Sequence, residues 1–267
     1  MPVGICRLCL EDRELQDSHL YPRSLYKALQ NEDGGNPNPV LLTTEKFVQK
    51  SGHIKDYVLC HDCEQRLNRY GENWVTRHAF NGRDFPLREI LRGYPPVEPT
   101  QDDRLVPYAG AEISEIDIDS LIFFGISLFW RASAHEWTLL DTKIQLPLDA
   151  HEEQLRLCLL GKVPIPDDVC MNIMVCSHDA PCRSFSALGP LGDPAGERKY
   201  LIMLAGLNFM LNVESAHFGD YQWSTTHSPH RYIYTSSSFE LMNTYLTASA
   251  FLKQKGLDAK WRLHLEL

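Results

Sequence analysis

The sequence predicts an α+β protein whose larger part is built on a mostly antiparallel sheet. Three β-type apolar runs, VCMNIMVCS, KYLIMLAGLNFMLNVE and RYIYTS, lie in the C-terminal half. Apolar residues recur at helical spacing in other segments, and helices that do not alternate regularly with strands are typical of this class. Eight cysteines, four of them in two CxxC pairs, indicate a smaller part near the N-terminus with its own means of stabilisation.

We expect the chain to divide into residues 1–95, a linker over 96–119, and residues 120–267. Between Gly93 and Ser120 the stretch GYPPVEPTQDDR concentrates proline and acid, and AGAEISEIDIDS continues it with acidic, weakly apolar sequence. Such a composition is typical of linkers.

Short elements are predicted in the first part. In chain order they are an extended segment near 14–20, a helix over about 23–30, a turn-rich insertion at 31–40, a strand at 56–60 and a helix over about 61–79. The last helix rests on the recurrence of Leu67, Tyr70, Trp74, Val75 and His78 on one helical face. Gly71 inside it costs about 1 kcal/mol relative to alanine.

The second part is predicted to open with a helix over 118–135. Leu155 and Leu159 suit a short helix that ends at Gly161. Gly206, inside the longest β-type run, is either a hairpin turn or a bulge. A last helix is expected over about 239–255, because serines precede it and a glycine follows it.

The longest apolar run, LIFFGISLFW at 121–130, is half of the roughly 20 residues that a membrane-spanning helix needs. The segment MPVGICRLCLEDRE has neither the basic nor the apolar region of an export signal. We therefore expect no membrane span and a cytoplasmic protein. Disulfides are unusual in a reducing compartment, so the paired cysteines point first to a metal.

The formal net charge of −9 argues against extensive phosphate contact, but its distribution is uneven. Residues 1–95 carry 13 basic and 13 acidic side chains, whereas residues 96–267 carry 13 and 22. Six arginines against four acids over 64–92 form a weak basic stripe in the first part.

Cys6, Cys9, Cys60 and Cys63 are predicted to hold a structural zinc ion. A CxxC pair lets two thiolates reach one ion from a single tight turn, and four sulfurs complete a closed tetrahedral site. The fifty residues between the pairs exceed the spacing of compact zinc ribbons, which indicates a larger insertion. The alternative is thiol redox chemistry at one CxxC, but that motif usually accompanies a βαβ pattern, and none is visible.

The order of these motifs resembles that of zinc-containing HNH endonucleases, also called ββα-metal or His-Me finger nucleases. A CxxC turn is followed by a strand ending in DSHLYP and then by VLCHDCE, which leads into a helix. The resemblance covers about residues 6–74 and implies a treble-clef, ββα-metal module. In this family the strand carries a metal ligand and then a histidine that acts as general base, and the helix supplies a further ligand.

By this resemblance, His19 matches the general base and Glu64 stands at the position of the helix histidine. Ser18 stands where the family has an acidic or imidazole ligand, which is a departure from the pattern. Mg²⁺ prefers oxygen ligands, so Glu64 with Asp17 or Asn68 is the predicted site of a catalytic Mg²⁺ or Mn²⁺ ion. A related variant with SH, a following proline and LCxxCE occurs in bacterial HNH-like proteins, some of them linked to defence against phage.

Each of these residues also has a structural interpretation. Ser18 caps a turn, His19 is an ordinary surface or core imidazole, and Pro22 begins a helix. Glu64 is a first-turn acid that is favourable next to the helix dipole. Arg66, Arg69 and His61 are predicted to contact the nucleic acid, although the loop position of His61 suits plain exposure equally well.

Other groupings are weaker. Cys170, Cys176, Cys182 and His178 offer a second cluster, but Cys170 and Cys176 share one face of a predicted strand, where free cysteine behaves as a small buried apolar residue. His227 and His230 lie in a predicted turn. The stretch FWRASAHEW places Arg131, His135 and Glu136 near a helix end that more often packs a core than binds a ligand. The sequence contains no phosphate-binding glycine loop, GxSxG or HExxH motif.

The sequence predicts a metal-dependent endonuclease that acts on DNA or RNA, with DNA favoured. The enzyme is expected to take part in a bacterial anti-phage system. The acidic C-terminal part is expected to bind a partner protein or to regulate the first part. The alternative is a catalytically inactive zinc-binding adaptor in a multiprotein complex. A zinc-dependent transcription regulator is a third interpretation, for which a concentrated basic face is lacking.

Overall fold

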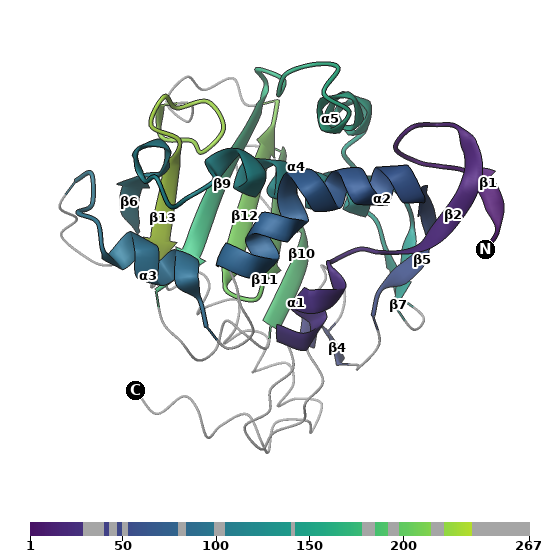
Figure 1. The fold of residues 1–267 in the computed structure, drawn as a ribbon, viewed down its shortest axis with the longest axis horizontal. Helices are drawn as coiled ribbons and strands as arrows, with labels where there is room; N and C mark the ends of the chain where they lie inside the picture. The colour runs from purple at the N-terminus through teal and green to yellow at the C-terminus, as the bar shows by residue number, and fades with distance from the viewer. Residues whose placement is uncertain are drawn as a thin grey trace.

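A computed structural model describes residues 1–28, 40–42, 47–49, 53–79, 84–98, 105–139, 142–177, 185–191, 198–214 and 222–236. Its elements form a mixed α+β fold with one three-stranded, one eight-stranded and one two-stranded sheet (Figure 1). The predicted α+β class is therefore confirmed. Within the described residues, none of the helices has the length and apolar character needed to cross a membrane.

The small sheet contains β1 (Val3–Ile5), β2 (Asp12–His19) and β5 (Lys55–Cys60), all antiparallel in the order β1-β2-β5. The predicted extended segment and the strand at 56–60 correspond to β2 and β5. Helix α1 (Arg23–Ala28) follows β2 and covers the described part of the predicted helix over 23–30. The predicted turn-rich insertion lies outside the described residues except for Val40.

The large sheet has the strand order β4-β3-β10-β11-β12-β9-β13-β6. Its strands are β3 (Val40–Leu42), β4 (Phe47–Gln49), β6 (Val106–Ala109), β9 (Val169–Cys176), β10 (Phe185–Leu191), β11 (Arg198–Leu204), β12 (Leu207–Val213) and β13 (Tyr232–Ser236). Neighbours are antiparallel except β3 with β10 and β9 with β13, so the prediction of a mostly antiparallel sheet is confirmed. Ala205 and Gly206, with φ of 52° and 87°, form the β11–β12 turn, which settles the choice for Gly206 in favour of a hairpin.

The large sheet takes strands from all three predicted segments of the chain. β3 and β4 come from residues 1–95, and β6 lies inside the predicted linker and pairs with β13. Tyr108 of β6 is buried, which explains why this part of the linker is held in the sheet. One continuous apolar core contains side chains from both predicted parts, such as Leu59 and Phe209.

A long helix lies between the large sheet and the helix formed by residues 61–79. In helix α4 (Ile118–Ala134) every residue from Leu121 onward except Phe123 is buried, because the helix has neighbours on opposite sides. On one side, a Cβ atom at Gly125 would lie 2.7 Å from Phe209 of β12. On the other, α4 packs against the helix that begins with α2 (His61–Leu67) and continues through π-helical turns at Asn68–Glu72 and Val75–Ala79. The predicted helices over 61–79 and 118–135 are confirmed.

The remaining helices lie around these layers, as Figure 1 shows. They are α3 (Pro86–Arg92), the 3₁₀ turn at Gly110–Glu112 and α5 (Ala150–Leu159). Gly161, with φ of 71°, follows the end of α5, as the predicted short helix requires. β7 (Trp137–Leu139) and β8 (Thr142–Ile144) form a separate hairpin. The predicted helix over 239–255 lies outside the described residues.

Gly71 allows the π-helical turn to approach α4 closely. A Cβ atom there would lie 3.0 Å from the backbone of Phe124, which cannot move as a flexible side chain can. We expect Gly71→Ala to lower the free energy of unfolding by about 1–3 kcal/mol, the usual cost of overpacking. Urea denaturation measures this change, and Gly4→Ala, whose Cβ would meet only the Leu15 side chain, is the control. Equal stability of the two variants would contradict this account.

Candidate metal centre and the polar site beside it

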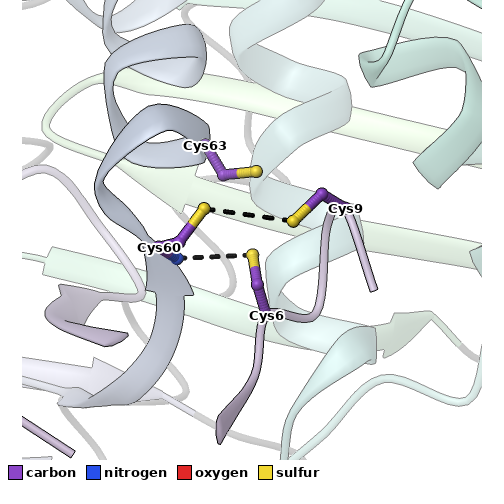
Figure 2. Close-up of side chains that lie close together, drawn as sticks. All are labelled: Cys6, Cys9, Cys60 and Cys63. Carbon is purple, nitrogen blue, oxygen red and sulfur yellow. Dashed lines mark hydrogen bonds between the residues drawn. The ribbon is translucent and has the colours of Figure 1, made fainter. Parts of the chain in front are cut away.

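The four predicted cysteines converge on one point (Figure 2). Cys6 and Cys9 lie on the turn between β1 and β2, and Cys60 and Cys63 lie where β5 passes into α2. All four sulfur atoms are within 4.8 Å of one another, and the Sγ atoms of Cys9 and Cys60 are 4.0 Å apart. A tetrahedral zinc ion with bonds of about 2.3 Å to each sulfur separates its ligands by about 3.8 Å. The cluster therefore has the geometry to hold a metal ion such as zinc.

Backbone hydrogen bonds hold the two halves of this cluster together. The Arg7 N–H donates to the Val58 carbonyl of β5 at 3.1 Å, which ties the first turn to the neighbouring strand. Leu10 closes that turn with a φ of 63°, and its N–H donates to the Cys6 carbonyl at 2.8 Å. The Cys60 N–H then donates to the Cys6 sulfur at 3.3 Å. The pairing of β2 with β5 thus brings together cysteines that are fifty residues apart.

The thiols of the cluster cannot all ionise without a cation. A hydrogen bond from the Cys63 thiol lowers the pKa of Cys6 to about 4. The pKa of Cys63 is raised, because its proton is held in that bond and because a second thiolate so close would be repelled. Burial raises the pKa of Cys9. A divalent ion would remove this conflict, since coordinating thiols are deprotonated outright.

Two arginines connect the cysteine turns to α5. Arg156 of α5 donates from Nη1 to the Leu8 carbonyl at 2.6 Å, inside the Cys6–Cys9 turn. Arg66 of α2 donates from Nε to the Leu159 carbonyl at 2.6 Å, and its guanidinium lies 4.9 Å from the Tyr70 ring centroid. The Nε donor of Arg66, which was predicted to contact nucleic acid, is therefore engaged inside the protein.

The two residues before His19 have partners of their own. Ser18 is buried, and its hydroxyl accepts a hydrogen bond from the Leu59 N–H at 3.1 Å. Asp17 is exposed and forms an ion pair with Lys55 across the β2–β5 ladder. Ser18 thus lies inside β2 and does not cap a turn as the structural interpretation expected, and its hydroxyl instead holds the backbone of β5.

His19 lies at the end of β2 beside a second imidazole, that of His53. His19 Nε2 and His53 Nδ1 are 3.1 Å apart, and the His53 ring stacks on Tyr26 with centroids 4.4 Å apart. Burial lowers the pKa of His19 below its ordinary 6.5, and the neighbouring His53 lowers it further. Burial also lowers the pKa of His53. At neutral pH both rings are therefore uncharged, the state in which an imidazole accepts a proton.

Stability should therefore fall in mild acid because of this pair. The unfolded chain takes up a proton on His19 near pH 6.5, before the folded protein does, so the free energy of unfolding decreases as pH falls through that value. We expect wild type to lose more stability than His19→Gln between about pH 7.5 and about pH 5.5, the range around the ordinary histidine pKa. Urea denaturation at both pH values measures the difference. His78→Gln, at an exposed position, should behave like wild type, and a His19→Gln profile parallel to wild type would refute the assignment.

Glu64 shares a buried guanidinium with Glu72 and His19. Arg131 of α4 has a side chain only 2% exposed, and its Nη2 is 2.5 Å from Glu72 Oε1 and 3.8 Å from Glu64 Oε2. Its Nη1 donates to the backbone carbonyl of His19 at 3.4 Å. Among the described residues, Glu64 Oε1 and Arg131 Nε are buried without a hydrogen-bond partner.

The predicted site residues are thus only partly assembled. The backbone carbonyl of His19 and the carboxylate of Glu64 lie near different nitrogen atoms of the Arg131 guanidinium, and the charge of Glu64 acts on His19. Asn68 is half-buried one turn after Glu64, whereas His61 and Arg69 are exposed. In the part of the chain that the structure describes, the four cysteines are the one group of three or more cysteine, histidine or acidic side chains placed to share an ion.

Sequence reasoning missed His53 and Glu72 and gave Arg131 a packing role. His53 lies in the stretch SGHIKDYVLC just before β5, where no motif marks it. The signal for Arg131 was its position in the apolar sequence FWRASA, because a buried arginine requires an acidic partner. Glu72 is that partner, and it lies eight residues after Glu64 on the same continuous helix.

The groupings set aside from the sequence are placed as follows. Cys170 is a buried cysteine on β9, as expected. Cys176 is disulfide-bonded, so the expectation that it is a free buried cysteine is wrong. His178 and Cys182 lie outside the described residues. His135 hydrogen-bonds Asp56 at 2.9 Å, and His227 hydrogen-bonds the Val169 carbonyl at 2.7 Å.

Comparison with known proteins adds no family to this geometry. The chain matches no protein-family model, and no curated protein or solved structure is significantly similar to it.

Proposed function

We propose that this protein is an HNH-like endonuclease that hydrolyses phosphodiester bonds of DNA or RNA with the help of a divalent cation. In this proposal the Cys6–Cys9 turn, the β2–β5 pair and α2 form a treble-clef, ββα-metal module, and the four cysteines hold a structural zinc ion. The observation that supports it best is the polar site beside the cysteines, where one buried guanidinium contacts both the carbonyl of His19 and the carboxylate of Glu64.

His19 is the proposed general base. Its ring is half-buried and its pKa is lowered, so at neutral pH it carries a free lone pair that can take a proton from water. His53 contacts one ring nitrogen of His19 and leaves the other for that water. A general base must be held in a fixed orientation, and the contact with His53 supplies that constraint on the ring.

Glu64 is the proposed ligand of a Mg²⁺ or Mn²⁺ ion. Its Oε1 atom is buried and has no hydrogen-bond partner among the described residues, and a buried acceptor without a partner is costly. The three charged side chains, Arg131, Glu64 and Glu72, carry a formal excess of one negative charge in a largely buried place. A cation at Glu64 Oε1 would give that oxygen a partner and would offset the negative charge. Asn68, one turn further along the helix, is the proposed second ligand.

When bound, the cation would supply charge stabilisation for the phosphate and for the leaving oxygen. Glu64 would hold it, and His19 would accept the proton of the attacking water. The zinc would take no part in the hydrolysis. Its role would be to join the β1–β2 turn to the start of α2, so that β2 and α2 present their two functional side chains together.

The proposed nucleic-acid contacts are His61, at the start of α2, and Arg69, in the π-helical turn that follows it, and both are exposed. The acidic residues from 96 onward, which hold the whole charge deficit, suit a partner protein better than they suit phosphate. A role in defence against phage belongs to the same proposal, and it follows only from the sequence resemblance.

Cleavage of plasmid DNA and of single-stranded RNA by the zinc-loaded protein tests the activity. We expect nicking that requires Mg²⁺ or Mn²⁺ and that falls roughly 10²–10⁴-fold in His19→Ala, the usual contribution of a general base. His78→Ala, a change of the same residue type at an exposed position, should cleave like wild type. Cleavage that survives in His19→Ala would contradict the assignment of the base.

The second candidate function is that of a zinc-binding adaptor without activity. It is favoured by the engagement of Ser18 with the β5 backbone, because this position lacks the metal ligand of the resembled family. The ion pair between Asp17 and Lys55 also favours the adaptor, because it engages the carboxylate of a predicted metal ligand. If the protein holds one zinc ion but cleaves neither DNA nor RNA with Mg²⁺, Mn²⁺ or Ni²⁺, and takes up no Mn²⁺ at Glu64, the adaptor assignment replaces the nuclease.

A further inference from the structure

Helix α4, which lies outside the proposed nuclease module in sequence, contributes a charged group to the site. This group is the guanidinium of Arg131, and two contacts hold the backbone of α4 in place around it. The Trp137 indole N–H donates to the Arg131 backbone carbonyl at 2.7 Å, and Gly71 lets α4 pack directly against the π-helical turn that carries Glu72. Its guanidinium therefore has little freedom to leave the site.

Arg131 divides its contacts unequally between two carboxylates. The contact with Glu72 is a close hydrogen-bonded ion pair at 2.5 Å, whereas Glu64 is 3.8 Å away and is not hydrogen-bonded to the guanidinium. Glu72 is the more deeply buried partner, with 11% of its side chain exposed against 22% for Glu64. Glu72 thus holds the guanidinium and leaves Glu64 without a close cationic partner.

We propose that Glu72 and Arg131 are positioning residues that set how strongly Glu64 binds a divalent cation, which rests on the proposed role of Glu64 as a ligand. Arg131 and a metal ion compete for the same carboxylate, because each supplies positive charge to it. Glu72 favours the metal ion in this competition, because its ion pair with Arg131 keeps the guanidinium away from Glu64. The site is consequently completed by α4, and its metal affinity depends on a residue that touches neither the metal nor the substrate.

Binding of Mn²⁺ to the full-length, zinc-loaded protein, measured by electron paramagnetic resonance, tests this proposal without any cleavage assay. Glu72→Gln keeps the shape of the side chain but removes its charge, so Arg131 should turn to Glu64 and weaken Mn²⁺ binding by roughly 10–100-fold, as loss of outer-shell partners of metal sites typically does. Glu89→Gln makes the same change in an exposed glutamate paired with Arg92 and should bind Mn²⁺ like wild type.

The double variant Glu72→Gln/Arg131→Met separates positioning from a merely structural role. With the guanidinium gone, Glu64 has no competitor, so Mn²⁺ affinity should return to within about threefold of wild type, a difference of less than 1 kcal/mol. If Glu72 only supported the fold, this second substitution would weaken binding further. Circular dichroism confirms that each variant is folded, and the single variant Glu72→Gln carries the test by itself if the double variant does not fold.

The outcomes separate the two proposals. Wild type that takes up no Mn²⁺ beyond its zinc would overturn the role of Glu64 and with it the proposed function. Wild type that takes up Mn²⁺ and cleaves nucleic acid, while Glu72→Gln binds Mn²⁺ with unchanged affinity, would overturn only the positioning role of Glu72 and Arg131.

Discussion

Cys63→Ser should lower the free energy of unfolding by about 4 kcal/mol or more, the range reserved for loss of a metal site or a comparable structural centre. The substitution would remove one of four ligands and leave three buried or half-buried thiols that cannot share an ion in a closed tetrahedral site. The turn between β1 and β2 would then be held against β5 and the start of α2 only by hydrogen bonds and packing. Urea denaturation followed by tryptophan fluorescence measures the loss.

Cys158→Ser is the matched control, because Cys158 is a half-buried free thiol on α5 outside the cluster. It should change stability by no more than about 1 kcal/mol, the typical value for a point substitution. Treatment of wild type with a strong zinc chelator should reproduce the effect of Cys63→Ser. If Cys63→Ser and Cys158→Ser unfold at the same urea concentration and the chelator has no effect, the cysteines have no metal-binding role in stability.

Arg131→Met should be the second most damaging substitution, with an expected loss of about 3–5 kcal/mol, the usual result of breaking a buried ion pair from one side. It would leave Glu64 and Glu72 in a largely buried place with no counter-charge between them. It would also remove the hydrogen bond to the His19 carbonyl, which helps to hold the end of β2. The loss is measured by urea denaturation at neutral pH.

Arg92→Met is the control for this prediction. Arg92 is an exposed arginine paired with Glu89, and exposed ion pairs contribute about 0–1 kcal/mol. Adding Glu72→Gln to Arg131→Met should recover part of the lost stability, because one of the two unbalanced charges is then absent. An Arg131→Met variant as stable as Arg92→Met would mean that the guanidinium is not the counter-charge of these carboxylates.

Local patterns predicted the parts of the fold that depend on local sequence. The helical spacing over 61–79 and 118–135, the glycine after α5 and the β-type runs all correspond to observed elements. The prediction of which face of the helix over 61–79 is buried was less accurate, because the π-helical turns of this helix rotate the side chains. Tyr70, predicted on the buried face, is exposed for that reason.

Two of the strands missed by sequence reasoning, β6 and β3, are held by partners that are distant along the chain. β6 was assigned to a linker because proline and acidic residues surround it, but its pairing with β13 depends on residues more than a hundred positions away. β3 is short and pairs with β10, which also lies more than a hundred positions away along the chain. A sequence pattern of three residues cannot indicate such pairing, since the free energy comes from the sheet that receives the strand.

The candidate site shows the same division between local and distant information. The cysteines were predictable because CxxC fixes the chemistry within four residues, and strand pairing then had only to bring two such motifs together. The contact of Arg131 with Glu72 and His19 required knowledge of how α4 packs on the helix of residues 61–79. No spacing rule contains that packing, and Gly71, which permits it, was recognised in the sequence only for its cost to the helix.

The most direct test of this account is the metal content and ligand set of the purified protein. Elemental analysis should find one zinc ion per chain, and replacement by Co²⁺ should give the absorption of a tetrahedral ion with four sulfur ligands, lost in Cys63→Ser and retained in Cys158→Ser. A protein without bound metal, in which Cys6, Cys9, Cys60 and Cys63 all react as free thiols and Co²⁺ produces no sulfur-ligand absorption, would contradict it.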